Sequence, residues 1–295
     1  MNSLNYDIKD KLKRLNVFEK IIGINLVVYI MGWLISVIQN VSRANSLSWL
    51  ELPSDFYSFI VKPWSIITYG FSHFDFWHLF FNMLILYFVG RSLFNMFSVK
   101  LSLNVYLLGI ISGGILFMTL YTILPNSGLF RVGALVGASA GVRAVLIFLC
   151  AYMPNKEAIF AVFRVKLMYI GLIIIGLDVL GLFGDNQGGN VAHLGGAALG
   201  YFYAIQLKKG IDIGKKFERF MDRLTSFFSF KKETKLKTVY KKQKVKTYAG
   251  HTKQEFNEFN TQKRIDIILD KISKSGYESL NEDEKTFLFK AGKNE

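Results

Sequence analysis

Two stretches decide the fold of this chain: Gly137-Ala138-Ser139-Ala140-Gly141 and Ala192-His193-Leu194-Gly195-Gly196-Ala197-Ala198-Leu199-Gly200. Each of them puts one reactive polar side chain among small residues within an apolar run. Lipid tolerates such groups poorly, so a hydroxyl and an imidazole at membrane depth need partners or a function. Ser139 and His193 are therefore the first candidates for a catalytic pair.

The composition indicates a membrane protein. Hydrophobic residues make up 51% of the chain and the mean hydropathy is +0.28, which is more apolar than an ordinary soluble domain. The single cysteine, Cys150, excludes an intrachain disulfide and is expected to be a small buried hydrophobe. We therefore expect an all-α protein that crosses the membrane several times.

Six stretches are candidates for these crossings, because a helix needs roughly 20 apolar residues to span a bilayer. They are 20–39, 77–97, 101–124, 135–153, 166–183 and 190–207. The sequence thus predicts a six-helix membrane domain over residues 20–207. Basic residues precede the first stretch and no convincing cleavage site follows it, which favours a retained anchor over a signal peptide.

The distribution of lysine and arginine predicts the orientation, because short cytoplasmic loops collect these residues. They are frequent in the N-terminal segment, the second and fourth connections and the tail, and scarce in the third and fifth connections. We therefore expect the N-terminal segment 1–19 and the C-terminus to be cytoplasmic. The long first connection is amphipathic, which is typical of a segment lying in the membrane interface.

This orientation puts the starts of the second, fourth and sixth stretches at the outer end of the membrane. His78, Ser139 and His193 lie near those starts, so at about 1.5 Å per helical residue they can share one depth. A serine attacks an acyl group effectively when a base takes its proton and donors receive the oxyanion. Ser139 and His193 would supply nucleophile and base. His78 and Asn82, four residues apart on one helical face, are the candidate oxyanion donors.

Small residues near this pair would let the helices approach closely. Gly196 and Gly200 share one face of the sixth stretch, and Gly137 and Gly141 flank the serine in the fourth. A serine and a histidine have short side chains, so they can hydrogen-bond only if their helices nearly touch. Close packing without any chemistry stays open as an alternative.

Three motifs carry a family resemblance. The pair His78-x-x-x-Asn82, the motif Gly137-x-Ser139 and the motif Ala192-His193-x-x-Gly196-x-x-x-Gly200, in this order over about residues 17–207, resemble a rhomboid intramembrane serine protease of bacterial type. The resemblance implies hydrolysis of peptide bonds in or next to a substrate's transmembrane segment, by a Ser139–His193 dyad without a triad acid. It also implies that His78, Asn82 and the Ser139 backbone amide hold the oxyanion, with no metal and no cofactor.

Two positions depart from the family pattern. Ala140 follows the serine where the family usually has glycine, and its methyl group is expected to narrow the pocket or weaken the turn. Phe94 stands where many relatives carry an acidic residue. Arg143 and Asp178 lie within apolar stretches, where a structural ion pair, or a carboxylate near the outer interface, is the commoner role. Tuning of a water cavity by Arg143 is the alternative, and neither residue is assigned to catalysis.

The tail differs in character from the membrane domain. Residues 208–247 hold 14 Lys or Arg against four acidic residues, which indicates a basic juxtamembrane linker that favours anionic lipid. No nucleic-acid motif accompanies this charge. In residues 248–295, Gly276 separates an isoleucine-rich segment from Asn281 and an acidic run, which predicts a small hairpin of two helices. It resembles a hairpin appended to some bacterial rhomboids.

The function expected from these features is that of an intramembrane serine endopeptidase in the inner (plasma) membrane. Its substrates would be transmembrane proteins that enter sideways from lipid, and its site would open to the outer face. A catalytically inactive rhomboid-like protein that binds membrane helices is the principal alternative. A small-solute transporter would need paired broken helices and inverted repeats, of which the sequence has no convincing example.

Overall fold

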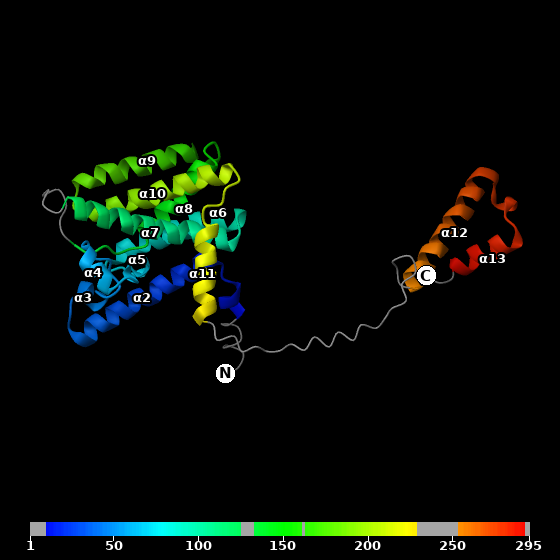
Figure 1. The fold of residues 1–295 in the computed structure, drawn as a ribbon. Helices are drawn as coiled ribbons and strands as arrows, with labels where there is room; N and C mark the ends of the chain where they lie inside the picture. Colours follow the sequence, from blue (N-terminus) through cyan, green and yellow to red (C-terminus); the bar gives the residue numbers. More distant parts are fainter. Residues whose placement is uncertain (1–9, 125–132, 161–162, 229–252, 293–295) are drawn as a thin grey trace. The chain divides into compact units, whose positions relative to one another are not determined.

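The computed structural model describes residues 10–124, 133–160, 163–228 and 253–292. The chain divides into two compact units, Met1–Phe230 and Lys231–Glu295. In the part of the chain that is described, both units are helical except for one short hairpin of strands in the first (Figure 1).

Six long helices of the first unit coincide with the six predicted stretches to within a few residues at each end. They are α2 (Val17–Gln39), α6 (Phe76–Met96), α7 (Val99–Ile123), α8 (Ser139–Tyr152), α9 (Leu167–Leu180) and α10 (Gln187–Lys208). Helices α2, α6 and α7 are long and apolar enough to cross a membrane, while α8 and the run of α9 with η2 (Gly181–Phe183) are shorter apolar helices. The all-α membrane bundle is thus confirmed, and the count of six crossings stays a prediction.

Polar residues just outside the apolar runs fix the starts of several helices. Asn16 caps α2 and forms a capping box with Glu19. Asp75 accepts the backbone N–H of His78 at the start of α6, and Ser98 caps α7. Such caps satisfy the backbone donors that have no partner inside a helix. Helix α8, by contrast, has no side chain capping its first turn.

Helix α8 is the centre of the bundle. From Ala140 to Cys150 every residue except Arg143 is buried, as expected for a helix that is surrounded by other helices. Helices α7 and α10 run alongside it, and α9 lies on the outer side of α10 (Figure 1). Helix α9 fully buries only Gly171 and Asp178. Leu167, Ile174 and Ile175 are half-buried against the core, and most of its other apolar side chains are exposed, where lipid would contact them.

The first connection folds back against the bundle as a series of short helices. These are α3 (Arg43–Ser46), α4 (Phe56–Val61), α5 (Ser65–Thr68) and η1 (Tyr69–Phe71). A two-residue bridge joins it to the segment before α8, where the backbone of Leu52 exchanges hydrogen bonds of 3.1 and 2.8 Å with that of Leu135. Both leucines are buried. This bridge helps to hold the start of α8 against the rest of the unit.

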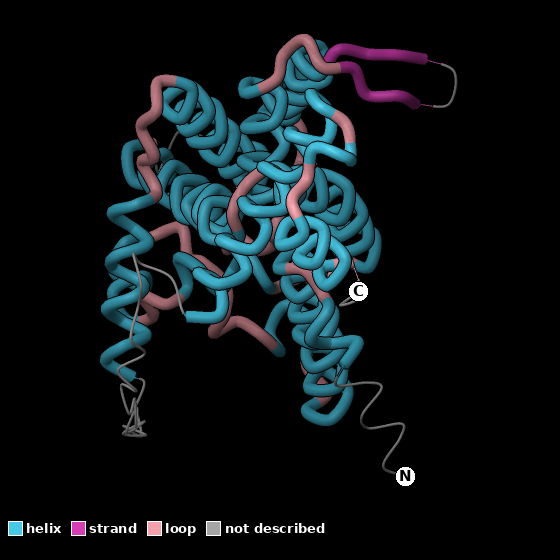
Figure 2. Tube along the Cα trace, turned by 90° about the vertical axis from the view of Figure 1, so that its right-hand side faces the viewer, coloured by secondary structure: helices cyan, strands magenta, loops and turns pink. Residues whose placement is uncertain are grey.

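Two elements differ from the sequence-based expectation. Strands β1 (Glu157–Phe160) and β2 (Phe163–Lys166) form an antiparallel hairpin that projects from the end of the bundle between α8 and α9 (Figure 2). Helix α11 (Lys215–Phe228) lies within residues 208–247, which were expected to be a linker.

Helix α11 is fastened to α7 by an ion pair. The Nζ of Lys100 lies 2.6 Å from a carboxylate oxygen of Glu218 and 3.2 Å from one of Asp222. Glu218 and Asp222 are four residues apart and so lie on the same face of α11, where both carboxylates can contact the lysine. The expected linker is therefore helical over its first part, and its continuation through residues 229–252 lies outside the described residues.

The second unit contains a hairpin of helices. It consists of α12 (Lys253–Ser275), η3 (Tyr277–Ser279) and α13 (Glu282–Ala291). Gly276 has φ +79° at the turn, and Asn281 forms a capping box with Glu284 at the start of α13. Ile268 and Leu280 are buried between the helices. The two helices and the glycine turn agree with the sequence-based expectation for this segment.

Candidate active site

The segment before Ser139 is held in place by two hydrogen bonds. Gly137 has φ +112°, which a residue with a side chain rarely adopts. Its backbone N–H donates to the Tyr69 carbonyl at 2.9 Å. The next N–H, of Ala138, donates to the Nε2 of His73 at 3.2 Å. Ser139 then begins α8, so its position is set by both the turn and the helix.

The uncapped start of α8 leaves backbone donors near the serine. The first N–H groups of a helix have no partner inside it, and the helix dipole adds partial positive charge at this end. Ser139 is the first residue of the helix, and no side chain caps that turn. The local structure therefore provides N–H groups that can stabilise an anion forming beside the serine hydroxyl.

His78 and Asn82 lie on α6 beside this turn. A Cβ added to Gly137 would lie 2.6 Å from Cε1 and 2.8 Å from Nε2 of His78, so the imidazole covers the glycine two residues before Ser139. The side-chain amide of Asn82 donates to the His78 carbonyl at 2.8 Å, which takes one of its two N–H groups. His78 therefore directly contacts the turn that leads into Ser139 (residues 137–139, the serine turn). Asn82 is buried one helical turn further along α6.

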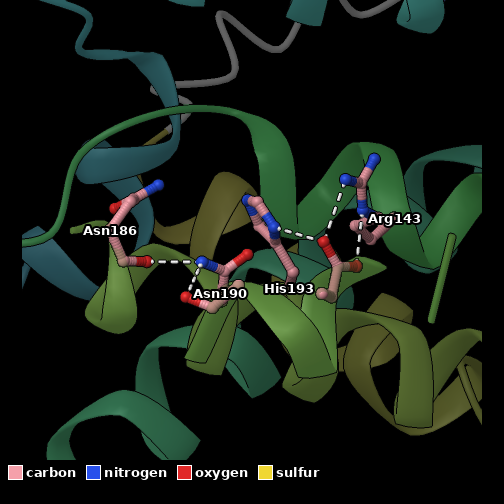
Figure 3. Close-up of polar contacts among 6 residues, drawn as sticks. Arg143, Asn186, Asn190 and His193 are labelled. Atoms are coloured by element: carbon pink, nitrogen blue, oxygen red, sulfur yellow. Dashed lines mark hydrogen bonds and ion pairs between the residues drawn. The ribbon is translucent and has the colours of Figure 1, made fainter. Parts of the chain in front are cut away.

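His193 is held from α9 by Asp178. Its Nδ1 lies 2.9 Å from Oδ1 of Asp178, and Arg143 binds the same carboxylate through Nε at 2.8 Å and a terminal nitrogen at 3.0 Å (Figure 3). The Asp178 side chain is 3% exposed. An ionised carboxylate only accepts hydrogen bonds, so Nδ1 is the donor and Nε2 keeps its lone pair.

The beginning of α10 is fixed by the side chain of Asn190. The amide of Asn190 donates to the carbonyls of Gly181 at 2.9 Å and Asn186 at 2.7 Å, as Figure 3 shows for the pair Asn186 and Asn190. These bonds tie the first turn of α10 to η2 at the end of α9. The helix that carries His193 and the helix that carries Asp178 are thus joined at their common loop.

Helices α8 and α10 touch along their backbones. A Cβ added to Gly196 would collide with the carbonyl oxygen of Ala140, and one added to Gly200 would collide with that of Ala144. Gly141 faces the other way and accommodates the ring of Tyr106, which would lie 2.7 Å from an added Cβ. These glycines therefore permit the close approach that a short serine and histidine need.

The methyl group of Ala140 is accommodated by a glycine on α7. Ala140 is fully buried, and a Cβ added to Gly113 would lie 2.6 Å from its methyl and 2.7 Å from the Ala192 carbonyl oxygen. The space for the methyl group thus comes from the absence of a side chain at Gly113. The departure from the family pattern at this position has a structural compensation.

Ser139 and His193 belong to the two helices that touch, but no hydrogen bond joins their side chains within the described parts of the chain. Catalytic hydrogen bonds are often long without substrate and shorten when it binds. The structure brings the four predicted residues to one end of the bundle, with His78 and Ser139 connected through Gly137, and His193 through the α8–α10 contact.

A cavity of about 370 Å³ opens beside His78. Its remaining lining comes from α7, from the segment before Ser139, from the loop that leads into α10 and from the first turn of α10: Phe117, Tyr121, Gly133, Ala134, Leu135, Val136, Asp185, Asn186, Gln187, Gly188 and Gly189. The segment 133–136 leads directly to the turn before Ser139, so the cavity adjoins that turn.

Four residues of this site have roles that the sequence did not indicate. His73 lies in the quoted run before α6 without a role, and Asp178 was expected to pair with Arg143 but not with His193. Gly109 and Gly113 are spaced as in a close-packing motif, which could have indicated that α7 joins the contact of α8 with α10. The expected ion pair itself is present.

Comparisons with known proteins agree with the fold. The family model of the rhomboid domain matches residues 61–210, and a family of unknown function matches residues 253–291.

The curated relatives are three mitochondrial proteins. The chain is 29% identical over 158 residues to RHOMBOID-like protein 12 of Arabidopsis thaliana, a match that covers 50% of this chain and 47% of that protein. It is 30% identical over 159 residues to Rhomboid protein 1 of Saccharomyces cerevisiae (52% and 44%). It is also 28% identical over 142 residues to Presenilin-associated rhomboid-like protein A of Danio rerio (47% and 36%).

The chain thus spans less than half the length of each of these relatives. Since all three are mitochondrial by name, the bacterial type inferred from the sequence stays a prediction. The family match covers half of the chain and contains every residue of the candidate site. The chain is a multi-pass membrane protein that belongs to the rhomboid family.

Proposed function

We propose that the protein is an intramembrane serine endopeptidase that hydrolyses peptide bonds in or next to the transmembrane segments of membrane proteins. Ser139 is the nucleophile and His193 is the general base. His78, Asn82 and the backbone N–H of Ser139 stabilise the oxyanion. Substrate transmembrane proteins are the partners that this chemistry requires.

The observation that supports this proposal most is how the imidazole of His193 is oriented by its hydrogen bond. Its Nδ1 is occupied by Asp178 at 2.9 Å, which leaves Nε2 as the acceptor, on a helix whose backbone touches the helix that Ser139 begins. A histidine that only filled space in a core would not need to be oriented in this way. The arrangement is that of a base prepared to take a proton from a neighbouring hydroxyl.

The reaction would proceed in two stages. The Ser139 Oγ attacks the peptide carbonyl carbon while its proton passes to His193 Nε2, and the negative oxygen forms near the start of α8. His193 then gives the proton to the leaving amine, and the C–N bond breaks to leave an acyl-enzyme. Water entering through the cavity beside His78 attacks the acyl carbon and loses its proton to His193. His193 then passes this proton to the Ser139 Oγ as the ester C–O bond breaks, and the second product leaves as a carboxylic acid.

The decisive experiment uses the purified full chain, reconstituted with a transmembrane reporter substrate. Ser139→Ala should lower the cleavage rate at least about 100-fold, which corresponds to about 2.7 kcal/mol of lost barrier lowering. Ser102→Ala is the matched control: this serine also lies within a helix, it is fully buried, and its hydroxyl has no hydrogen-bond partner in the described structure. Cleavage by Ser139→Ala at the unmutated rate would refute the proposal.

A non-catalytic function on the same fold is the second candidate. It is favoured by the lack of a hydrogen bond between the side chains of Ser139 and His193 in the described structure, and it would consist of binding unstable membrane helices without cutting them. A serine-directed fluorophosphonate probe separates the two functions. Labelling of the wild type that disappears in Ser139→Ala supports the protease, and a wild type that stays unlabelled supports the binding protein.

The orientation, the compartment and the lipid partner are further parts of the proposal. The protein lies in a plasma membrane with both termini in the cytoplasm. The cavity opens to the outer face, and the basic tail binds anionic lipid. The charge distribution supports this, and in α11 the basic side chains lie near the exposed apolar side chains of Phe220 and Leu224. A membrane-impermeant thiol reagent on intact cells should label Gly133→Cys and not Lys209→Cys, and the reverse pattern would overturn the orientation.

A further inference from the structure

Asp178 is a buried carboxylate on a helix, α9, whose residues are mostly exposed. Of the residues of α9, only Gly171 and Asp178 are buried. Removing a charged group from water costs several kcal/mol unless partners replace the solvent. Asp178 has two such partners, Arg143 of α8 and His193 of α10. The carboxylate of α9 therefore binds side chains of two other helices, so three helices are connected at the proposed catalytic base.

Resting on the proposed function, we propose that Asp178, held by Arg143, is a positioning residue for His193. The proposed machinery is then a Ser139–His193–Asp178 triad rather than a dyad. The carboxylate accepts the Nδ1–H of His193, keeps Nε2 directed at the serine and stabilises the imidazolium that forms during attack. Arg143 acts on Asp178 and does not contact the reacting atoms.

The geometry distinguishes this role from that of a simple structural ion pair. Arg143 engages both carboxylate oxygens, at 2.8 and 3.0 Å, which fixes the plane of the carboxylate. Oδ1 then accepts a second bond, from His193 at 2.9 Å. An arginine alone would have satisfied a buried aspartate. The additional bond to the histidine means that the fixed carboxylate also fixes the ring.

Arg143 also sets the charge around the base. Asp178 and Arg143 together are neutral, so His193 gains a proton beside a balanced pair rather than beside an isolated negative charge. His78 of α6 interacts electrostatically with His193, and Asp185 and Tyr121 line the cavity that adjoins His78. Helix α7 carries its one charged side chain, Lys100, near its first residue, which is the end of the helix opposite Tyr121.

The test compares Asp178→Asn with Arg143→Met in the reconstituted full chain. Asp178→Asn should lower kcat about 10²-fold or more with KM nearly unchanged, because the base loses its orientation and charge support. In the pH dependence of kcat/KM, the acid limb should move to lower pH for Asp178→Asn and to higher pH for Arg143→Met. Shifts of about one to three pH units are expected for charges at these distances.

A double variant separates positioning from structural pairing. If Asp178 serves only to neutralise Arg143, removing both charges in Asp178→Asn/Arg143→Met should restore kcat to nearly the wild-type value. If Asp178 positions His193, the double variant should stay about as slow as Asp178→Asn. Lys100→Met, which removes a different ion pair, should leave both kcat and the acid limb unchanged. Recovery of kcat in the double variant, or acid limbs that do not move in opposite directions, overturns the proposal.

A spectroscopic measurement keeps the proposal independent of activity. In full-length Ser139→Ala protein with ¹⁵N-labelled histidine, His193 should carry its proton on Nδ1, and this signature should be lost in Ser139→Ala/Asp178→Asn. A proton on Nε2 in the first protein refutes the triad even if the enzyme is active. If Ser139→Ala retained full cleavage activity, the proposed function would fail while the orientation of His193 by Asp178 could still be observed.

Discussion

Gly196→Ala is the sharpest test of the contact between α8 and α10. A Cβ at this position would collide with the Ala140 carbonyl oxygen and would lie 2.8 Å from its carbonyl carbon. Ordinary van der Waals contact begins near 3.4 Å, so the helices must separate by at least about 0.6 Å. The obstacle is backbone, which cannot rotate away, and overpacking of this kind costs about 1–3 kcal/mol.

The control variant is Gly176→Ala on α9, where an added Cβ meets nothing within 4 Å. Alanine is favoured over glycine within a helix by up to about 1 kcal/mol. The two substitutions share this gain, so the difference between them isolates the collision. Gly176→Ala should leave the unfolding temperature unchanged or raise it, and Gly196→Ala should lower it by several degrees.

Catalysis should respond more strongly than stability. A misplacement of about 1 Å between reacting groups can cost about 10²-fold in rate, and Gly196 lies three residues beyond His193 on the helix that would be displaced. Cleavage of a transmembrane reporter by Gly196→Ala should therefore fall 10- to 100-fold, with unfolding followed by tryptophan fluorescence in the same detergent. Equal unfolding temperatures and equal rates for the two variants would refute the reasoning.

Two further predictions concern the serine turn and the C-terminal hairpin. Gly137→Ala should cost about 1–3 kcal/mol and lower cleavage strongly, because its φ of +112° is strained for alanine and the new methyl would meet His78. Gly210→Ala is the control, because Gly210 also has a positive φ (+80°) but an added Cβ there meets nothing within 4 Å; an unaffected Gly137→Ala enzyme would contradict the described turn. The hydrogen bond from Lys271, and then that from the Asn281 backbone, hold the pKa of Glu284 below its ordinary value of 4.5. This contribution to stability is therefore present above about pH 4.5 and is lost as the pH falls through the lower folded pKa. Glu284→Gln should loosen α13 in amide exchange at pH 7, and its difference from wild type should shrink as the pH falls below 4.5.

The membrane helices could be predicted from the sequence because length and hydropathy determine them. The apolar runs end at polar capping residues such as Asn16, Asp75 and Ser98, so their boundaries are local properties. Ser139, His193, His78 and Asn82 could be named for a similar reason, since each is a polar residue in an apolar run, and Ser139 and His193 also have small neighbours. Their meeting at one end of the bundle follows from the alternation of helix direction.

The partner of His193 could not be predicted in this way. Helix α9 is apolar on every side, so no periodicity in its sequence indicates which face turns inward. Asp178 meets His193 only because α9 packs with that face against α8 and α10. His73 is equally hidden, because its bond to the Ala138 N–H depends on how the first connection folds against the serine turn. Both contacts are products of tertiary packing.

Ala140 shows why a motif is better judged together with the surface that faces it. By itself the residue departs from the family pattern, and its methyl group was expected to narrow the pocket. In the folded protein the methyl fills the space left at Gly113 on a neighbouring helix, and a Cβ on both residues could not be accommodated. Since packing depends on the summed volume across a contact and not on either residue alone, the methyl group belongs to the interface between α7 and α8. The methyl group packs on the helix that Ser139 begins, and Gly113 supplies the space that it needs.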